Sequence, residues 1–175
     1  MRYVALLRGI NVGGNTMIKM EELRRTFEAL GFERVVSYIN SGNLAFDSPK
    51  GSDVKLAAMI EKAVEGLIGK NVSVMVREQK HILQVLANNP FDGQYASHKE
   101  MHVLFMKDEM PPEKQEQLRS LAPARERFEI AGREIYCHLP MGVADSLMGR
   151  GLFEKKLKVS VTARNWRTVE TIAKL

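Results

Sequence analysis

The sequence predicts an α+β fold built from two tandem copies of a ferredoxin-like βαββαβ unit, each followed by a helix. Two observations support this prediction: the order of apolar-periodic segments, which repeats in the second half, and a pair of similar six-residue segments. These segments are Val72–Arg77 (VSVMVR) and Val159–Arg164 (VSVTAR), and a helical pattern follows each. Self-similarity of this kind indicates an internal duplication. We expect antiparallel sheets that carry helices on one face.

The first half begins with the apolar run Tyr3–Leu7, a predicted buried strand that leads into the glycine-rich loop Gly9–Gly14. The helical segments show apolar residues at spacings of three and four, and Ser52 is a suitable N-cap for the second helix. The further predicted elements are helix 20–30, strands 34–39 and 44–46 joined by a turn at 40–43, helix 53–68, strand 72–76 and helix 78–88.

The second half follows a polar linker at residues 92–99 and shows the same order. Its predicted elements are strand 101–106, helix 112–121, strands 127–130 and 134–139, helical segments within 145–158, strand 159–164 and helix 166–174. We therefore predict two domains, residues 1–91 and 100–175.

The βαββαβ order makes a geometric prediction about the loops. In such a sheet the first two strands are parallel, with the third antiparallel between them, so the first strand ends at the edge where the hairpin turns. The loop Arg8–Gly14 should therefore lie beside the turn Asn40–Asn43. Arg77 and Arg164 should lie at the opposite edge of their sheets.

Composition excludes several classes of protein. The chain has 175 residues, of which 45% are hydrophobic and 27% charged, so it can bury a core and is not disordered. Its first apolar run is shorter than the roughly 7–15 residues of a signal peptide, and none approaches the roughly 20 that span a bilayer. The only cysteine, Cys137, cannot form an internal disulfide. We expect a cytoplasmic protein with no membrane partner.

Four sequence motifs resemble those of the bacterial domain of unknown function 1697 family. The motifs are Ala5–Gly14 (ALLRGINVGG), Tyr38–Asn43 (YINSGN), Asn89–Phe91 (NPF) and Thr162–Thr168 (TARNWRT). The resemblance implies a duplicated ferredoxin-like α+β protein, and it implies no activity, substrate or catalytic residue. The chain departs from similar sequences within residues 140–148, where they carry Ser-Lys-Leu and Ser146 is here followed directly by Leu147.

The glycine-rich loop is the first candidate site. Gly9 and Gly14 have the spacing of a phosphate-binding loop, but Asn15 stands where that motif needs Lys, and about four residues separate Thr16 from the helix. A nucleoside triphosphatase is therefore disfavoured. An anion could instead be bound by the following polar groups: Arg8, Asn11, the amides of Gly13 and Gly14, Ser41 and Asn43. Alternatively, the glycines only permit positive φ, and both asparagines bond backbone groups in turns.

The segment Arg164–Arg167 is the second candidate site. Asn165 is a suitable N-cap that would accept a hydrogen bond from the Thr168 amide. Trp166 could stack on a base while Arg164 and Arg167 grip phosphate. The alternative is that Trp166 packs on the core and the arginines pair with carboxylates.

Charge supports a basic surface near the C-terminal end. The net charge is +5, and residues 150–175 hold seven Lys or Arg (150, 155, 156, 158, 164, 167 and 174) against Glu154 and Glu170, so they account for all of it. Such clustering is typical of a site for polyanions, although a solvated helix face has the same composition.

Other polar residues predict little chemistry. Cys137 alternates with Ile135 and Leu139 on a strand and is predicted to be a core residue. His98 and His102 straddle a linker and a strand start, so no metal site is predicted, and no cofactor motif is present.

The leading hypothesis is a binding module for a phosphate-bearing ligand, either a nucleotide or a nucleic acid. One alternative is an enzyme acting on a small anionic metabolite between Gly9–Gly14 and Asn40–Asn43, although no general base or nucleophile is identified there. Another is association through exposed sheet edges, giving a homodimer.

Overall fold

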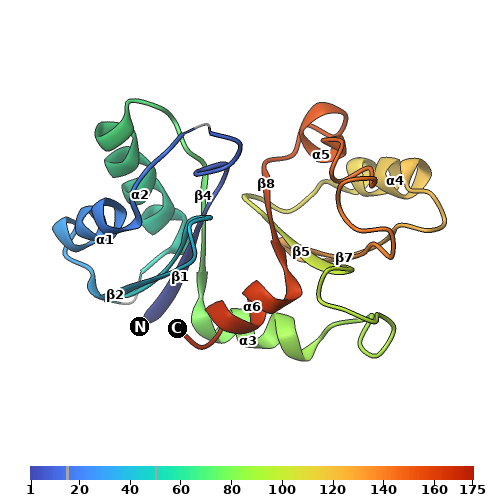
Figure 1. Cartoon of the computed structure of the whole chain (residues 1–175), viewed down its shortest axis with the longest axis horizontal. Helices are drawn as coiled ribbons and strands as arrows, with labels where there is room; N and C mark the ends of the chain where they lie inside the picture. Colours follow the sequence, from blue (N-terminus) through green and yellow to red (C-terminus); the bar gives the residue numbers. More distant parts are fainter. Residues whose placement is uncertain (15, 50) are drawn as a thin grey trace. The chain divides into compact units, whose positions relative to one another are not determined.

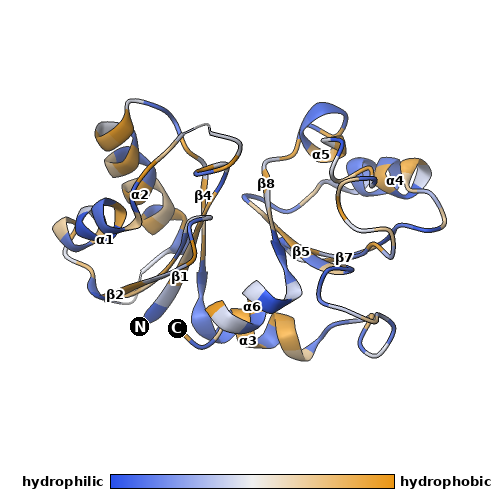
Figure 2. Ribbon diagram, in the orientation of Figure 1, coloured by the Kyte–Doolittle hydropathy of each residue, from blue (hydrophilic) through white to orange (hydrophobic). Residues whose placement is uncertain are grey.

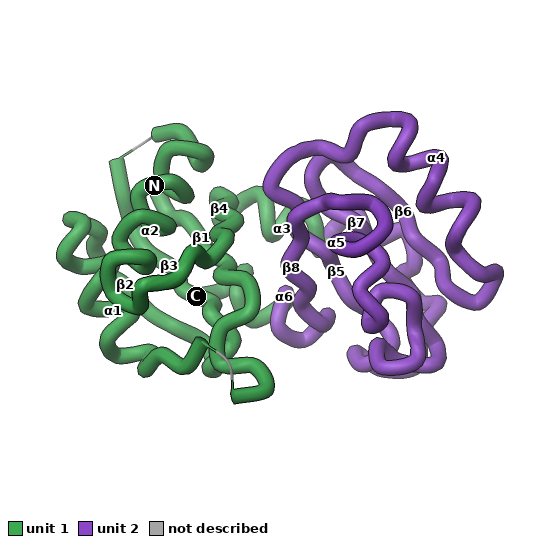
Figure 3. Tube along the Cα trace, turned by 90° about the horizontal axis from the view of Figure 1, so that it is seen from above, with its two compact units in different colours: residues 1–86, 170–175 green, residues 87–169 purple. Residues whose placement is uncertain are grey.

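The computed structural model describes residues 1–14, 16–49 and 51–175. It divides into two compact units, residues 1–86 with 170–175 (unit 1) and residues 87–169 (unit 2), which are coloured separately in Figure 3. Each unit holds one four-stranded antiparallel sheet (Figure 1). The predicted α+β duplication is confirmed. Asn15, which takes the place of a phosphate-loop lysine, lies outside the described residues.

The sheet of unit 1 has the strand order β2-β3-β1-β4. The elements of unit 1 are β1 (Arg2–Leu7), α1 (Met20–Ala29), β2 (Glu33–Tyr38), β3 (Asn43–Asp47), α2 (Asp53–Ile68), β4 (Val74–Glu78) and α3 (Gln79–Ala87). Because β3 is antiparallel to both β1 and β2, these two strands are parallel with β3 between them, as predicted.

The core of unit 1 lies between one sheet face and helices α1 and α2. Alternate β1 residues Tyr3, Ala5 and Leu7 join Phe27 of α1 and Ile60 of α2 in a single buried cluster. Apolar residues along β1 and over α2 are orange in Figure 2. Fully burying a side chain such as that of Phe27 contributes roughly 1.5–3 kcal/mol, so this cluster fixes the register of β1.

The sheet of unit 2 has the equivalent order β6-β7-β5-β8. Its elements are β5 (Met101–Met106), α4 (Pro112–Leu121), β6 (Arg127–Ala131), β7 (Glu134–His138), α5 (Leu152–Lys155) and β8 (Val161–Asn165). The last helix, α6 (Trp166–Ile172), begins in unit 2, and its final residues belong to unit 1. No described helix is long and apolar enough to cross a membrane.

Two buried arginines occupy equivalent places in the two sheets. Arg77 pairs with Val4 in unit 1, and Arg164 pairs with Val103 in unit 2. Each Nη1 donates to the carbonyl oxygen of the preceding residue, at 3.0 Å for Arg77 and 2.8 Å for Arg164. Burial lowers the pKa of Arg164 to about 10. Both arginines pair with residues near the beginning of the first strand of their unit. They therefore lie at the end of the sheet opposite to the loop that follows this strand, as predicted.

The second helix differs most between the units. Helix α2 has 16 residues and α5 only 4, so most of the helical structure predicted within 145–158 is wrong. The residues before α5 form turns in which Gly149 approaches the backbone of Val143, where an added Cβ would lie 2.1 Å from the carbonyl oxygen. Strands β4 and β8 also begin two residues later than predicted.

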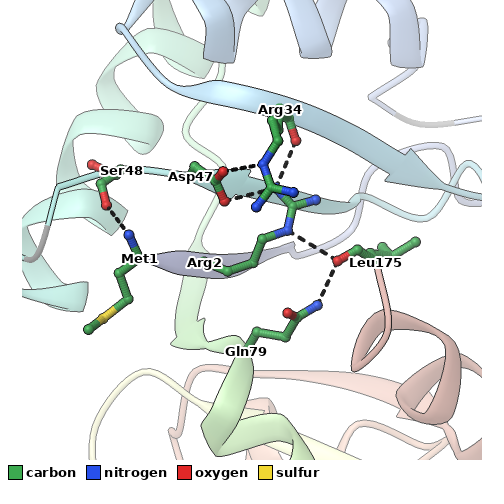
Figure 4. Close-up of polar contacts among 7 residues, drawn as sticks. All are labelled: Met1, Arg2, Arg34, Asp47, Ser48, Gln79 and Leu175. Carbon is green, nitrogen blue, oxygen red and sulfur yellow. Dashed lines mark hydrogen bonds and ion pairs between the residues drawn. The ribbon is translucent and has the colours of Figure 1, made fainter.

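Polar contacts hold both ends of the chain within unit 1 (Figure 4). Arg2 Nε donates to the Leu175 oxygen at 3.1 Å, and Gln79 Nε2 donates to the same oxygen at 2.7 Å. Arg2 Nη1 also bonds Asp47 Oδ1 at 3.1 Å and the Arg34 carbonyl at 2.8 Å. Hydrogen bonds from Arg34 and Arg2 lower the pKa of Asp47.

Candidate functional site

The glycine-rich loop lies beside the hairpin turn of unit 1, as predicted. The Leu7 amide donates to the Gly42 carbonyl at 2.9 Å, and Asn11 Nδ2 donates to the Asn40 carbonyl at 2.8 Å. Gly42 is required at this contact because its φ is +84° and an added Cβ would lie 2.8 Å from Leu7 Cβ. The two loops are therefore joined by hydrogen bonds at one end of the sheet.

The asparagine side chains of this edge bond backbone groups. Asn11 Oδ1 accepts from the Ile18 amide at 2.8 Å while its Nδ2 donates to the Ile18 carbonyl at 3.0 Å. Asn43 is fully buried, and its Nδ2 donates to the Tyr38 carbonyl at 3.1 Å and to Ser41 Oγ at 2.9 Å. These contacts match the alternative in which the asparagines stabilise the turns.

The other predicted ligand groups of this edge do not converge on one described cavity. Arg8, Gly13 and Gly14 are exposed. An open depression of about 610 Å³ next to the edge includes only Asn11 of the predicted ligand residues, and its remaining lining residues are Met17, Ile18, Lys19, Met20, Glu22 and Asn40.

The segment Arg164–Arg167 lies in unit 2 and is largely structural. Asn165 Oδ1 accepts from the Thr168 amide at 2.9 Å, which confirms the predicted N-cap. Trp166 is 8% exposed and makes an edge-on contact with Tyr95, with ring centroids 6.3 Å apart. Arg164 is buried, whereas Arg167 is exposed. The Trp166 ring and the Arg164 guanidinium therefore offer little surface to a ligand.

A basic pocket lies instead beside the shortened helix α5. It encloses about 260 Å³ and combines three exposed cations, Arg150, Lys155 and Lys156, with the side chains of Leu121, Leu147 and Leu152. Leu121 comes from α4, Leu147 from the turns before α5, and Leu152 from α5 itself. We call this site the basic pocket.

The three cations of the basic pocket make no ion pair with the carboxylates that the structure describes. Within residues 1–14, 16–49 and 51–175, neither Arg150, Lys155 nor Lys156 forms an ion pair. Their positive charges therefore face solvent together, which attracts anions and is weakened by salt.

Buried hydrogen bonds fix the turns that carry Arg150. Ser146 is fully buried, and its Oγ donates to the Val143 carbonyl at 2.6 Å and accepts from the Gly149 amide at 3.0 Å. The Leu147 amide donates to Glu126 Oε1 at 2.7 Å. Because these turns are already ordered, little further ordering is needed when a ligand binds.

Sequence reasoning did not single out the residues of the basic pocket. The charge excess of residues 150–175 was the available signal, and it included Arg150, Lys155 and Lys156. What the sequence could not show is that Leu121 and Leu147 meet these cations, because they lie on separate elements.

Cys137 and His102 lie opposite each other on β7 and β5. Burial and the nearby Glu126 raise the pKa of the Cys137 thiol well above its usual value, so it stays protonated and belongs to the core, as predicted. Burial, with a smaller effect of His98, lowers the pKa of His102 to about 4. The described residues contain no cluster of three or more metal-ligating side chains.

A profile of the DUF1697 family, whose members are described as proteins of unknown function, matches residues 1–136. The chain belongs to this family. A solved structure of a conserved bacterial protein from Streptococcus pneumoniae is similar to it, with 27% identity and a TM-score of 0.79 over 99% of this chain and 97% of that one. No curated protein matches the chain.

Proposed function

We propose that this DUF1697 protein binds a phosphate-bearing ligand, a nucleotide or a nucleic acid, in the basic pocket. The observation that carries the proposal is the group of cations without ion pairs, Arg150, Lys155 and Lys156, around an apolar floor.

The chemistry of the pocket suits a phosphate attached to a less polar group. The guanidinium of Arg150 offers paired donors that match phosphate oxygens, and each lysine adds a point charge. The leucine side chains provide apolar surface for a sugar or base. The volume of about 260 Å³ is below the 300–1,000 Å³ typical for enclosed ligands, so we expect only part of the ligand to enter.

The same residues favour binding over catalysis. Cations and apolar carbons bind and polarise a phosphate, but none of the residues that line the pocket is a carboxylate or histidine that could accept a proton. The enzyme alternative, which placed a reaction between Gly9–Gly14 and Asn40–Asn43, gains no support from loops whose asparagine amides bond the backbone.

The proposal is tested by binding of a labelled, mixed-sequence single strand of about 12 nucleotides, measured by fluorescence anisotropy as salt rises from about 50 to 200 mM. The variant Arg150→Gln/Lys155→Gln/Lys156→Gln should weaken binding at least about tenfold at low salt. It should also make the slope of log K against log salt less negative by about 2, since three phosphate contacts are lost.

A matched control changes the same charge around the corresponding helix of unit 1. The variant Lys55→Gln/Lys62→Gln/Lys70→Gln alters exposed lysines in and just after α2, and it should bind like the unmodified chain. Displacement of the strand by ATP would identify a mononucleotide as the smallest ligand, whereas no displacement would favour a polymer. Absence of binding at about 50 mM salt, or equal loss in both variants, would refute the proposal.

A further inference from the structure

We propose that the edge strand β6 of unit 2 pairs with the same strand of a second copy of this chain, joining two sheets across a two-fold axis. This interface is separate from the basic pocket and goes beyond the proposed function. Three features of β6 support this interface: backbone groups that point away from the sheet, a regular strand without a bulge, and charges that are complementary to those of a second copy.

The register of the sheet shows which β6 backbone groups point outward. The Met106 amide bonds the Arg133 carbonyl at 2.8 Å, and the Leu139 amide bonds the Glu100 carbonyl at 2.7 Å. Because hydrogen-bonded and non-bonded pairs alternate in an antiparallel ladder, Glu134, Tyr136 and His138 direct their backbone groups toward β6. Their partners are Ala131, Glu129 and Arg127.

The remaining β6 residues, Phe128 and Ile130, therefore direct their N–H and C=O groups away from β7. Strand β6 is the outer strand of its sheet, and no hydrogen bond to these groups occurs among the residues that the structure describes. Figure 3 shows β6 beside α4 in unit 2. Such a row of donors and acceptors is a template for another strand.

The equivalent edge strand of unit 1, β2, is irregular, whereas β6 is regular. Strand β2 has a register shift between Glu33 and Val36, and Arg34 within it has a φ of +48°. Its Arg34 carbonyl accepts from Arg2, and Ser37 Oγ accepts from Arg24 at 2.6 Å. A bulge is a device that prevents edge pairing. Strand β6 pairs with β7 without any register shift.

Charge selects a second copy of the same strand as the partner. If Phe128 lies opposite Phe128 of the other copy, Arg127 lies directly opposite Glu129 of that copy, twice by symmetry. Both side chains are exposed, and they occupy a non-hydrogen-bonded pair, where side chains approach most closely.

The neighbouring registers are disfavoured by like charges. Alignment about Glu129 would place Glu129 opposite itself, and alignment about Ile130 would place Arg127 opposite Arg133. Arg127 is also held in place, since its Nη2 lies 2.8 Å from His138 Nδ1 and its Nη1 donates to Gln94 Oε1 at 2.8 Å.

The surface beside β6 can accept an added strand. A groove of about 390 Å³ runs along β6 and is lined by residues that include Leu118 and Ala122 near the end of α4, together with Phe128 and Ile130. The groove leaves room for an added strand beside β6, and the Arg127–Glu129 pairs would form on the sheet face opposite to Phe128 and Ile130.

The oligomeric state tests the proposal by analytical ultracentrifugation at up to about 100 µM chain. The unmodified protein should form a dimer, and Glu129→Arg should weaken it at least about tenfold because both ion pairs become repulsive. The double variant Arg127→Glu/Glu129→Arg should restore it. A monomer at the highest concentration, or a dimer unaffected by Glu129→Arg, would overturn the proposal.

A crosslinking experiment does not depend on replacing Arg127, whose contacts also support the fold. Phe128→Cys should form an intermolecular disulfide, because opposed residues in a hydrogen-bonded pair have Cα atoms about 5.5 Å apart. The matched control Ile130→Cys leaves both ion pairs intact and should not, because residue 130 lies opposite residue 126 of the other copy, which places the two residues 130 roughly 14 Å apart. The native Cys137 is buried and does not interfere. Equal crosslinking of both variants would contradict the register.

Discussion

The two units share a strand order but differ at their surfaces. In unit 1 the long helix α2 covers the sheet, and the outer strand β2 contains a bulge. Unit 2 has the single-turn helix α5, with the basic pocket beside it, and the regular edge strand β6. Both units have therefore kept the same strand order, while the described part of unit 2 combines a basic pocket with a regular edge strand.

The two sheets share buried interactions whose removal would lower the stability of the protein. Arg77 and Arg164 are both buried, and each bonds the carbonyl of the residue before it. Removing either guanidinium would leave buried acceptors without donors, at a cost of about 1–3 kcal/mol per group. The differences instead lie at turns and edges, where the energetic constraint is weaker.

The largest expected effect is on the free energy of unfolding, and it compares a glycine in the turns of unit 2 with a glycine in helix α2 of unit 1. Gly149→Ala should lower the free energy of unfolding by about 4 kcal/mol, because its Cβ would lie 2.1 Å from the Val143 oxygen. Gly66→Ala in α2 should raise it by about 0.5–1 kcal/mol, since its Cβ meets nothing within 4 Å. Urea denaturation monitored by circular dichroism measures both. Similar values for the two variants would contradict the assigned turn geometry.

A somewhat smaller effect concerns acid stability. His102 in unit 2 has a pKa near 4, against 6.5 when exposed, because its site disfavours the charged form. The neutral histidine makes its full contribution to the free energy of unfolding above pH 6.5. About 3 kcal/mol of this free energy is lost as pH falls from 6.5 to 4, because only the unfolded chain binds the proton in this range. The fluorescence of Trp166, which lies in unit 2, should report this loss as urea midpoints that fall with pH.

Substitution of the histidine should remove this part of the acid dependence. His102→Leu is expected to flatten the urea midpoint between pH 6.5 and 4, whereas His81→Gln in unit 1 should leave it unchanged. The equivalent position in unit 1 is occupied by Tyr3, whose hydroxyl bonds the backbone of Gly51. An unaltered acid limb in the His102→Leu variant would show that another group is responsible.

The smallest expected effect compares one helix cap from each unit. Asn165→Ala should cost about 1 kcal/mol, because Oδ1 accepts from Thr168 at 2.9 Å. Ser52→Ala should cost about 0.5 kcal/mol, since the bond from Lys55 to Ser52 Oγ is 3.4 Å long. Thermal unfolding of both variants gives the comparison, and a larger loss for Ser52→Ala would reverse the ranking.

Periodicity predicted the fold well because burial alternates along the strands and recurs at helical spacing. The hexapeptides ending at Arg77 and Arg164 predicted the duplication, which their equivalent pairing explains. Of the helical segments predicted within 145–158 only α5 is present, because local apolar spacing could not show the approach of Gly149 to Val143.

The candidate site was harder to predict because the role of a polar side chain depends on contacts distant in sequence. An amide such as Asn11 can bind a ligand or a neighbouring loop, and only the position of Asn40 decides between them. Arginine is seldom buried, so the place of Arg164 in the sheet could not be read from its motif. The charge excess indicated the basic region of the sequence, but it did not predict which leucine side chains line the basic pocket.

The position of residues 170–175 in unit 1 has a consequence for synthesis on the ribosome. Unit 1 contains residues 1–86, but the Leu175 oxygen that Arg2 and Gln79 bind is made only after the whole of unit 2. Domains tend to fold in the order in which they emerge. Here the first unit to emerge gains its final segment last, so the nascent chain must keep that docking position open while the second unit is translated.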